Sequence, residues 1–224
     1  MKKNKENLNL KQSELKKKYG NTLVRGVPAS FVSSILKKIW TPAEEAEFIV
    51  RTPMEVHHTP LHMSLNVSME SRFRYEAELD PEFKQIIPYV VVMHDNKIWC
   101  THRLNGGDAR LAGCYSIGTG GHIDDGERIR DAMMRELNEE VGIVDADYIG
   151  SLLKGYIMDN SSSVNSVHLG VVYITYINRD SIECLEKEKL AGEWITVQQL
   201  NDLYNEGKLE SWSMIVADKL FFAR

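Results

Sequence analysis

The sequence has few cysteines and lacks any long apolar run. Its 224 residues include three cysteines, Cys100, Cys114 and Cys184, and no CxxC pair. An odd number of widely spaced cysteines indicates reduced thiols, not a disulfide framework or a zinc site. No run of about 18 apolar residues is present, so no membrane-spanning helix is expected. The N-terminal MKKNKENLNLKQ has no apolar stretch of the kind found in signal peptides, so a cytoplasmic location is expected.

Outside the N-terminus, acidic residues outnumber basic ones. Residues 1–20 hold seven lysines and two glutamates, a charge of +5; the chain as a whole has −5, which leaves −10 for the remainder. A body this acidic argues against a nucleic-acid-binding surface. We expect residues 1–19 to form a basic, flexible tail, with at most a weak helix that ends at Gly20.

The order of patterns along the chain predicts an α+β protein in which helices flank a mixed sheet. The apolar run at 86–94, with Pro88 near its start, predicts a central strand that turns at Asp95-Asn96 into a second strand. Further strands are expected at 115–123, 148–158, 167–177 and 193–196, and helices at 29–40, 128–141, 197–206 and 210–222.

The predicted helix at 128–141 carries a dense set of acidic residues. Glu136, Glu139 and Glu140 stand at i, i+3 and i+4, which places three carboxylates on one face. The neighbouring face is apolar and can dock on a core through Met133, Leu137 and Val141. Like charges at these spacings destabilise an isolated helix. A cation held between the carboxylates would remove that cost.

The spacing around this helix resembles the Nudix box. From Gly121 the sequence reads G-x5-E-x7-R-E-L-x-E-E-x-G-I, and every fixed position of the box is matched. Such a match arises by chance less than about once in a million chains of this length. The resemblance implies an α/β/α sandwich over residues 83–224. Residues 20–82 are then an N-terminal extension that packs on the core.

The resemblance also assigns roles to the matched positions. It implies that Glu139 and Glu140 bind metal together with Glu136 and the carbonyl oxygen of Gly121. Arg135 and Glu127 would form an ion pair that orients the helix. The metal would be Mg²⁺, with Mn²⁺ as a substitute, because hard cations take oxygen ligands and bind substrate phosphates. The general base would be Glu136 or an acid from the loop before Gly192-Glu193-Trp194, where Glu188 is the first candidate and Glu186 the second.

Other residues are candidates for contacts with substrate. Arg103 and Arg110 could clamp phosphate, although surface arginines are as common. His122 follows the two glycines and could also contact phosphate, or it could simply be satisfied by its neighbours. We expect His57, His58 and His62 to belong to a packed loop, because their spacing matches no metal-binding pattern.

The resemblance implies Mg²⁺-dependent hydrolysis of a phosphoanhydride, and our first hypothesis for the substrate is a nucleoside diphosphate linked to another moiety. The segment YSIGTGGHID lacks the aromatic-Pro-Gly-Gly element of the best-known nucleotide-cleaving members and is closer to a bacterial group of predicted phosphoesterases. One alternative is a regulatory Nudix domain that senses a nucleotide. Another is an enzyme similar to isopentenyl-diphosphate isomerase, although the cysteine required beside Gly120-Gly121-His122 is absent. The apolar final helix is also compatible with a homodimer.

Overall fold

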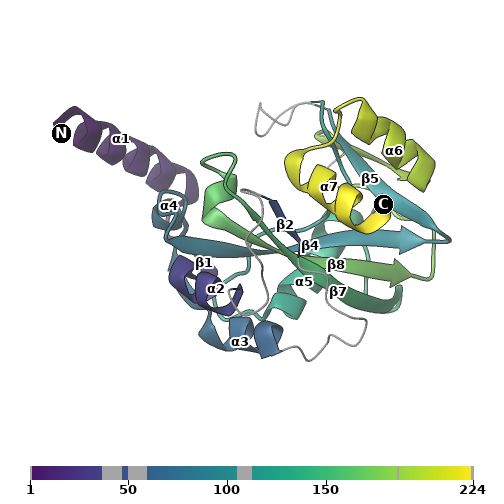
Figure 1. Cartoon of the computed structure of the whole chain (residues 1–224), viewed down its shortest axis with the longest axis horizontal. Helices are drawn as coiled ribbons and strands as arrows, with labels where there is room; N and C mark the ends of the chain where they lie inside the picture. Colours follow the sequence, from purple (N-terminus) through teal and green to yellow (C-terminus); the bar gives the residue numbers. More distant parts are fainter. Residues whose placement is uncertain (1, 37–46, 50–59, 105–112, 186, 223–224) are drawn as a thin grey trace.

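The computed structural model describes residues 2–36, 47–49, 60–104, 113–185 and 187–222 (Figure 1). Within this part of the chain, nine strands form one mixed sheet. Its centre is β4 (Phe83–His94), which runs parallel to β8 (His168–Ile177). The sheet continues from β8 through the antiparallel strands β7 (Tyr148–Asp159) and β2 (Glu47–Ile49).

The opposite edge of β4 is shared by two partners. Its first residues pair with β1 (Leu23–Pro28), and its last residues pair with β5 (Lys97–Arg103). The strands outside these are β3 (Glu70–Phe73) beside β1, and β6 (Tyr115–Ser116) and β9 (Leu190–Ile195) beside β5. The β4–β5 turn has positive φ at Asp95 (45°) and Asn96 (62°), which fits the predicted two-residue hairpin.

Helices cover both faces of the sheet, as the sequence predicts (Figure 1). Val90 and Val92 of β4 face one hydrophobic core and Tyr89 and Val91 face the other, because side chains alternate along a strand. The first core includes residues of α5 (Ile129–Val141), α2 (Ala29–Leu36) and α3 (Pro60–Ser68). The second includes residues of α6 (Val197–Asn205), α7 (Ser211–Val216) and the π-helical segment Ala217–Phe221.

The helix α5 forms where the sequence predicts it and buries the predicted face. Met133, Leu137 and Val141 are at most 1% exposed. The helix ends at Gly142, whose φ of 68° is a left-handed conformation that glycine adopts at little cost. The N–H of Ile143 then donates to the carbonyl of Leu137 at 3.1 Å. Burial of one face and a glycine cap therefore fix the helix that carries the three carboxylates.

The predicted strand at 115–123 is largely absent, because only Tyr115–Ser116 forms a ladder and Thr119 adds an isolated bridge to Val90. A Cβ on Gly118 would lie 2.0 Å from the Tyr89 ring, so the backbone of this segment runs against side chains of β4. A Cβ on Gly120 would lie 1.8 Å from the carbonyl oxygen of Pro88.

Pro88 also lies deeper in its strand than predicted, since β4 begins at Phe83. The nitrogen and carbonyl oxygen of one strand residue point to the same side. The carbonyl oxygen of Pro88 faces Gly120, so its missing N–H is on that side and not toward β8. The β4–β8 ladder therefore runs past Pro88 without loss.

The N-terminal segment joins the same sheet through β1 and β3. It begins with α1 (Lys2–Tyr19), which extends away from the body of the protein (Figure 1). The C-terminal end of α1 contacts α4 (Arg74–Ala77). The proposed division at residues 19 and 82 remains a prediction. None of the helices described here is long and apolar enough to cross a membrane.

The apolar side chains near the C-terminus pack within the chain. Trp212, Ile215 and Val216 are at most 9% exposed and belong to the core beneath α6 and α7. They therefore provide no argument for a dimer interface, and dimerisation remains a prediction.

Candidate active site

The guanidinium group of Arg135 is the centre of the polar arrangement on α5. Its Nε and Nη2 donate to the two carboxylate oxygens of Glu127, at 2.9 and 3.0 Å. Its Nη1 donates to Glu136 at 2.7 Å and to Glu139 at 3.2 Å. The hydrogen bonds that Arg135 donates to Glu127 and Glu136 raise the pKa of its guanidinium group, so the group stays charged. One side chain thus fixes the positions of three carboxylates.

The same guanidinium holds the glycine segment against the helix. Its Nη2 donates to the carbonyl oxygen of His122 at 2.8 Å. Glu127 closes the turn before the helix, because its carboxylate accepts the N–H of Asp124 at 2.9 Å. The hydrogen bond from Arg135 lowers the pKa of Glu127. The ion pair expected between Glu127 and Arg135 is thus present in the structure.

Gly121 lies against the carboxylate of Glu136. A Cβ at this position would be 2.4 Å from Glu136 Oε1, closer than real Cβ contacts occur. The side chain of Glu136 is only 12% exposed, and this burial raises its pKa. The backbone of Gly121 and the carboxylate of Glu136 therefore lie so close that a larger residue at position 121 would displace the carboxylate.

The three helix carboxylates differ in exposure. Glu139 has a side chain that is 59% exposed, whereas Glu136 and Glu140 are partly buried. With the carbonyl oxygen of Gly121 they provide only oxygen ligands, the donor set that Mg²⁺ prefers. Arg135 occupies one oxygen of Glu136 and one of Glu139. The residues therefore fit a hard divalent cation.

The second candidate for the general base, Glu188, lies in the loop before β9. Glu188 is exposed in the turn before β9. This loop contacts α5 through Leu185, whose N–H donates to the carbonyl oxygen of Glu140 at 2.8 Å. A catalytic role for Glu188 remains a prediction. Glu186 and Arg110 lie outside the described residues, as do His57, His58 and the side chain of His62.

Arg103 lines a pocket of about 200 Å³ beside the glycine segment. Gly118 and Gly120 form part of its wall, and Trp212 and Tyr89 form an aromatic part. The pocket therefore lies along the same backbone segment that carries Gly121 to the carboxylates. Arg103 is thus a predicted substrate residue that lines a cavity.

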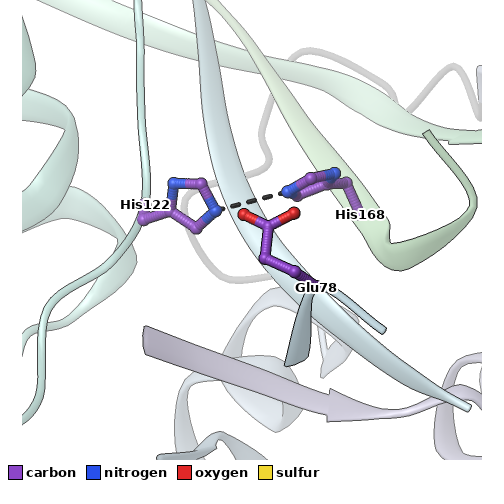
Figure 2. Close-up of side chains that lie close together, drawn as sticks. All are labelled: Glu78, His122 and His168. Carbon is purple, nitrogen blue, oxygen red and sulfur yellow. Dashed lines mark hydrogen bonds between the residues drawn. The ribbon is translucent and has the colours of Figure 1, made fainter. Parts of the chain in front are cut away.

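His122 faces a partner that the sequence patterns did not single out. Its Nε2 lies 3.3 Å from Nε2 of His168, at the start of β8, and the carboxylate of Glu78 is close to both (Figure 2). Burial lowers the pKa of both imidazoles, and the charge of Arg74 lowers that of His122 further. The only sequence signal was the position of His122 directly after Gly121. Neither Glu78 nor His168 belongs to a motif.

Comparison with known proteins agrees with this geometry. A sequence model of the NUDIX domain matches residues 85–215. Protein YmaB of Bacillus subtilis (strain 168) is 37% identical over 158 residues, which cover 66% of this chain and 76% of YmaB. An uncharacterized Nudix hydrolase of Nostoc, all7351, is 26% identical over 110 residues, 49% of this chain and 63% of that protein.

A solved structure extends the likeness beyond the matched domain. The crystal structure of Tm1382, a protein assigned to the Nudix hydrolases, superposes with a TM-score of 0.67 and 28% identity over 90% of this chain and 99% of that chain. The NUDIX model covers 131 of the 224 residues, about 58%, so a superposition over 90% of the chain includes much of the N-terminal segment. By its box residues, its fold and these relatives, the chain belongs to the Nudix hydrolase superfamily.

Proposed function

We propose that this protein is a Mg²⁺-dependent hydrolase that cleaves a phosphoanhydride bond in a nucleoside diphosphate linked to another moiety. The observation that carries the proposal is the contact between Gly121 and Glu136, with Arg135 holding Glu136 and Glu139. It places the backbone of the glycine segment against a carboxylate of the helix, which supports a shared metal site for the two elements. Superfamily membership makes hydrolysis of a diphosphate the expected reaction.

Each box residue has a distinct role in this proposal. Glu136, Glu139, Glu140 and the carbonyl of Gly121 hold Mg²⁺, for which Mn²⁺ could substitute. The bound ion would neutralise the diphosphate and lower the pKa of a water molecule. Arg135 and Glu127 position the carboxylates and do not touch the substrate. Arg103, in the wall of the pocket, is the proposed contact for a substrate phosphate.

Glu136 is the better candidate for the general base. Its side chain is only 12% exposed and lies against Gly121, within the proposed metal site. Glu188 is the alternative, because it lies in the loop that reaches α5 through Leu185. Glu136→Gln and Glu188→Gln distinguish them. The variant that removes the base loses the rise of turnover with pH, whereas the other keeps it.

A regulatory domain that binds a nucleotide without cleaving it is the second candidate. The N-terminal strands share the sheet of the box domain, which would connect a binding event to the extension. All box glutamates are present, and this favours the enzyme. An isomerase is disfavoured because Gly120 and Gly121 stand where that reaction needs a cysteine.

A substrate screen tests the proposal directly. Nucleotide sugars, ADP-ribose, dinucleotides, dinucleoside polyphosphates and nucleoside triphosphates are incubated with the full chain and Mg²⁺, and products are identified by chromatography. Cleavage of at least one nucleoside diphosphate derivative, lost in Glu140→Gln, is expected. Tight calorimetric binding of ADP-ribose without turnover of any compound would favour the sensor instead.

A further inference from the structure

Glu78, His122 and His168 meet at a place separate from the carboxylates of α5. They come from three distant parts of the chain: the end of α4, the glycine segment and the start of β8 (Figure 2). One ligand atom of each lies within 4.8 Å of the others. We propose that these three residues form a transition-metal site, with Zn²⁺ as the best-fitting ion.

The distance between the imidazoles fits this ion. Two nitrogens bound to one tetrahedral Zn²⁺ at about 2.0–2.1 Å lie about 3.3 Å apart. The separation of the two Nε2 atoms is 3.3 Å, where the rings share a hydrogen bond that a bound ion would replace (Figure 2). The Glu78 carboxylate faces the space between the rings (Figure 2) and can approach by rotation of its flexible side chain. Two histidines and one glutamate are a ligand set that leaves a fourth position open for water.

The surroundings prepare His168 as a ligand. Its Nδ1 lies 2.7 Å from the carbonyl oxygen of Val164, which can only accept a hydrogen bond. The proton of the neutral ring is therefore on Nδ1, and the lone pair is on Nε2, toward His122. Metal-binding histidines are usually oriented in this way by a carbonyl or carboxylate. His168 is also only 8% exposed, so its ring has little freedom to turn away.

Glu78 is held in a similar manner. Arg74, one turn earlier, places its Nε 3.2 Å from Glu78 Oε1, and the guanidinium lies over the ring of Tyr19 at 4.2 Å.

Beside His168 in the β4–β8 register stands Gln85, which is fully buried and whose amide has no hydrogen-bond partner. A buried amide without a partner is unfavourable, which indicates that a polar group such as bound water belongs nearby.

The site would connect the N-terminal segment to the reaction centre. His122 directly follows Gly121, so an ion on His122 also fixes the glycine that lies against Glu136. Glu78 belongs to the segment before the box domain. The ion thus ties that segment to the backbone beside the box carboxylates. The two sites select different ions, because nitrogen ligands favour Zn²⁺ and oxygen ligands favour Mg²⁺.

Zinc titration of the full chain tests the proposal. The protein is freed of metal with a chelator, saturated with Mg²⁺ and titrated with Zn²⁺ against a chromophoric chelator. One Zn²⁺ per chain is expected, with a rise in Tm, and Co²⁺ should give the visible spectrum of a tetrahedral complex. His168→Ala should weaken Zn²⁺ binding at least 100-fold. Glu78→Gln, at a more accessible position, should weaken it at least 10-fold.

Two controls separate this site from other histidines and from the box. His102, in β5, stacks on Tyr115 and lies outside the proposed site. The His102→Ala variant should therefore bind Zn²⁺ as the wild type does. Glu139→Gln with Glu140→Gln should also keep the site. Zn²⁺ binding that survives in both His168→Ala and Glu78→Gln, or that is lost in the box variant, would overturn the proposal. So would an absence of Zn²⁺ binding together with binding of inorganic phosphate, since Arg74 and Lys84 could instead hold an anion.

Discussion

Substitution of Gly121 by alanine tests the contact on which the proposed metal site depends. The added Cβ would lie 2.4 Å from Glu136 Oε1, whereas ordinary contacts begin near 3.4 Å. The carboxylate must therefore move by about 1 Å, which disturbs its 2.7 Å hydrogen bond with the Nη1 of Arg135. A misplacement of this size near a reaction centre reduces turnover by about 100-fold. Stability should change little, because the end of a flexible side chain can move.

The assay compares Gly121→Ala with Gly150→Ala, where an added Cβ meets nothing within 4 Å. Turnover of the best substrate from the screen is measured with Mg²⁺, Mn²⁺ affinity is measured by electron paramagnetic resonance, and Tm is recorded for both variants. Gly121→Ala should lose turnover and Mn²⁺ affinity but keep its Tm, and Gly150→Ala should keep all three. A folded Gly121→Ala protein with turnover within twofold of the wild type would refute the reasoning.

Two further predictions concern Arg135 and Asp147. Arg135→Lys loses the two parallel hydrogen bonds to the carboxylate of Glu127. Mg²⁺ affinity, measured by titrating turnover with Mg²⁺, should therefore fall about 10–100-fold. Unchanged Mg²⁺ dependence would count against a positioning role for Arg135. Hydrogen bonds from Arg179 and from the N–H of Val144 lower the pKa of Asp147 in the folded state. The ionised carboxylate therefore stabilises the fold at pH values above the unfolded pKa of about 3.9. This stabilisation is lost as the pH falls through the lower pKa of the folded state. Asp147→Asn should therefore be less stable than the wild type to urea at pH 7, with the difference shrinking toward pH 3; a difference that does not depend on pH would contradict the assignment.

The box helix was predictable because its information is local. The spacing of Met133, Leu137 and Val141 defines the buried face, and Gly142 ends the helix, so neighbouring residues determine both features. The contact between Glu127 and Arg135 is also local, across eight positions. The resemblance to the Nudix box added the expected fold, which the structure confirms.

The remaining features depend on contacts between distant residues. Glu78 lies at the end of a four-residue helix and meets His168, 90 positions later, through the pairing of β4 with β8. No pattern around either residue predicts this meeting. The strand predicted at 115–123 failed for a similar reason, because Gly118 is placed by the ring of Tyr89 and not by its own neighbours. The pairing of β1 with β4 could not be predicted either, since a local pattern does not specify strand partners.

We propose that the carboxylates on α5 hold a metal that supports hydrolysis. The most direct measurement is the turnover of Glu139→Gln at saturating Mg²⁺, with the substrate that the screen identifies. Glu139 is 59% exposed, so the fold should survive the change, which circular dichroism verifies. Turnover should fall by at least 100-fold while substrate still binds. Turnover equal to that of the wild type, in a folded variant under saturating Mg²⁺, would contradict it.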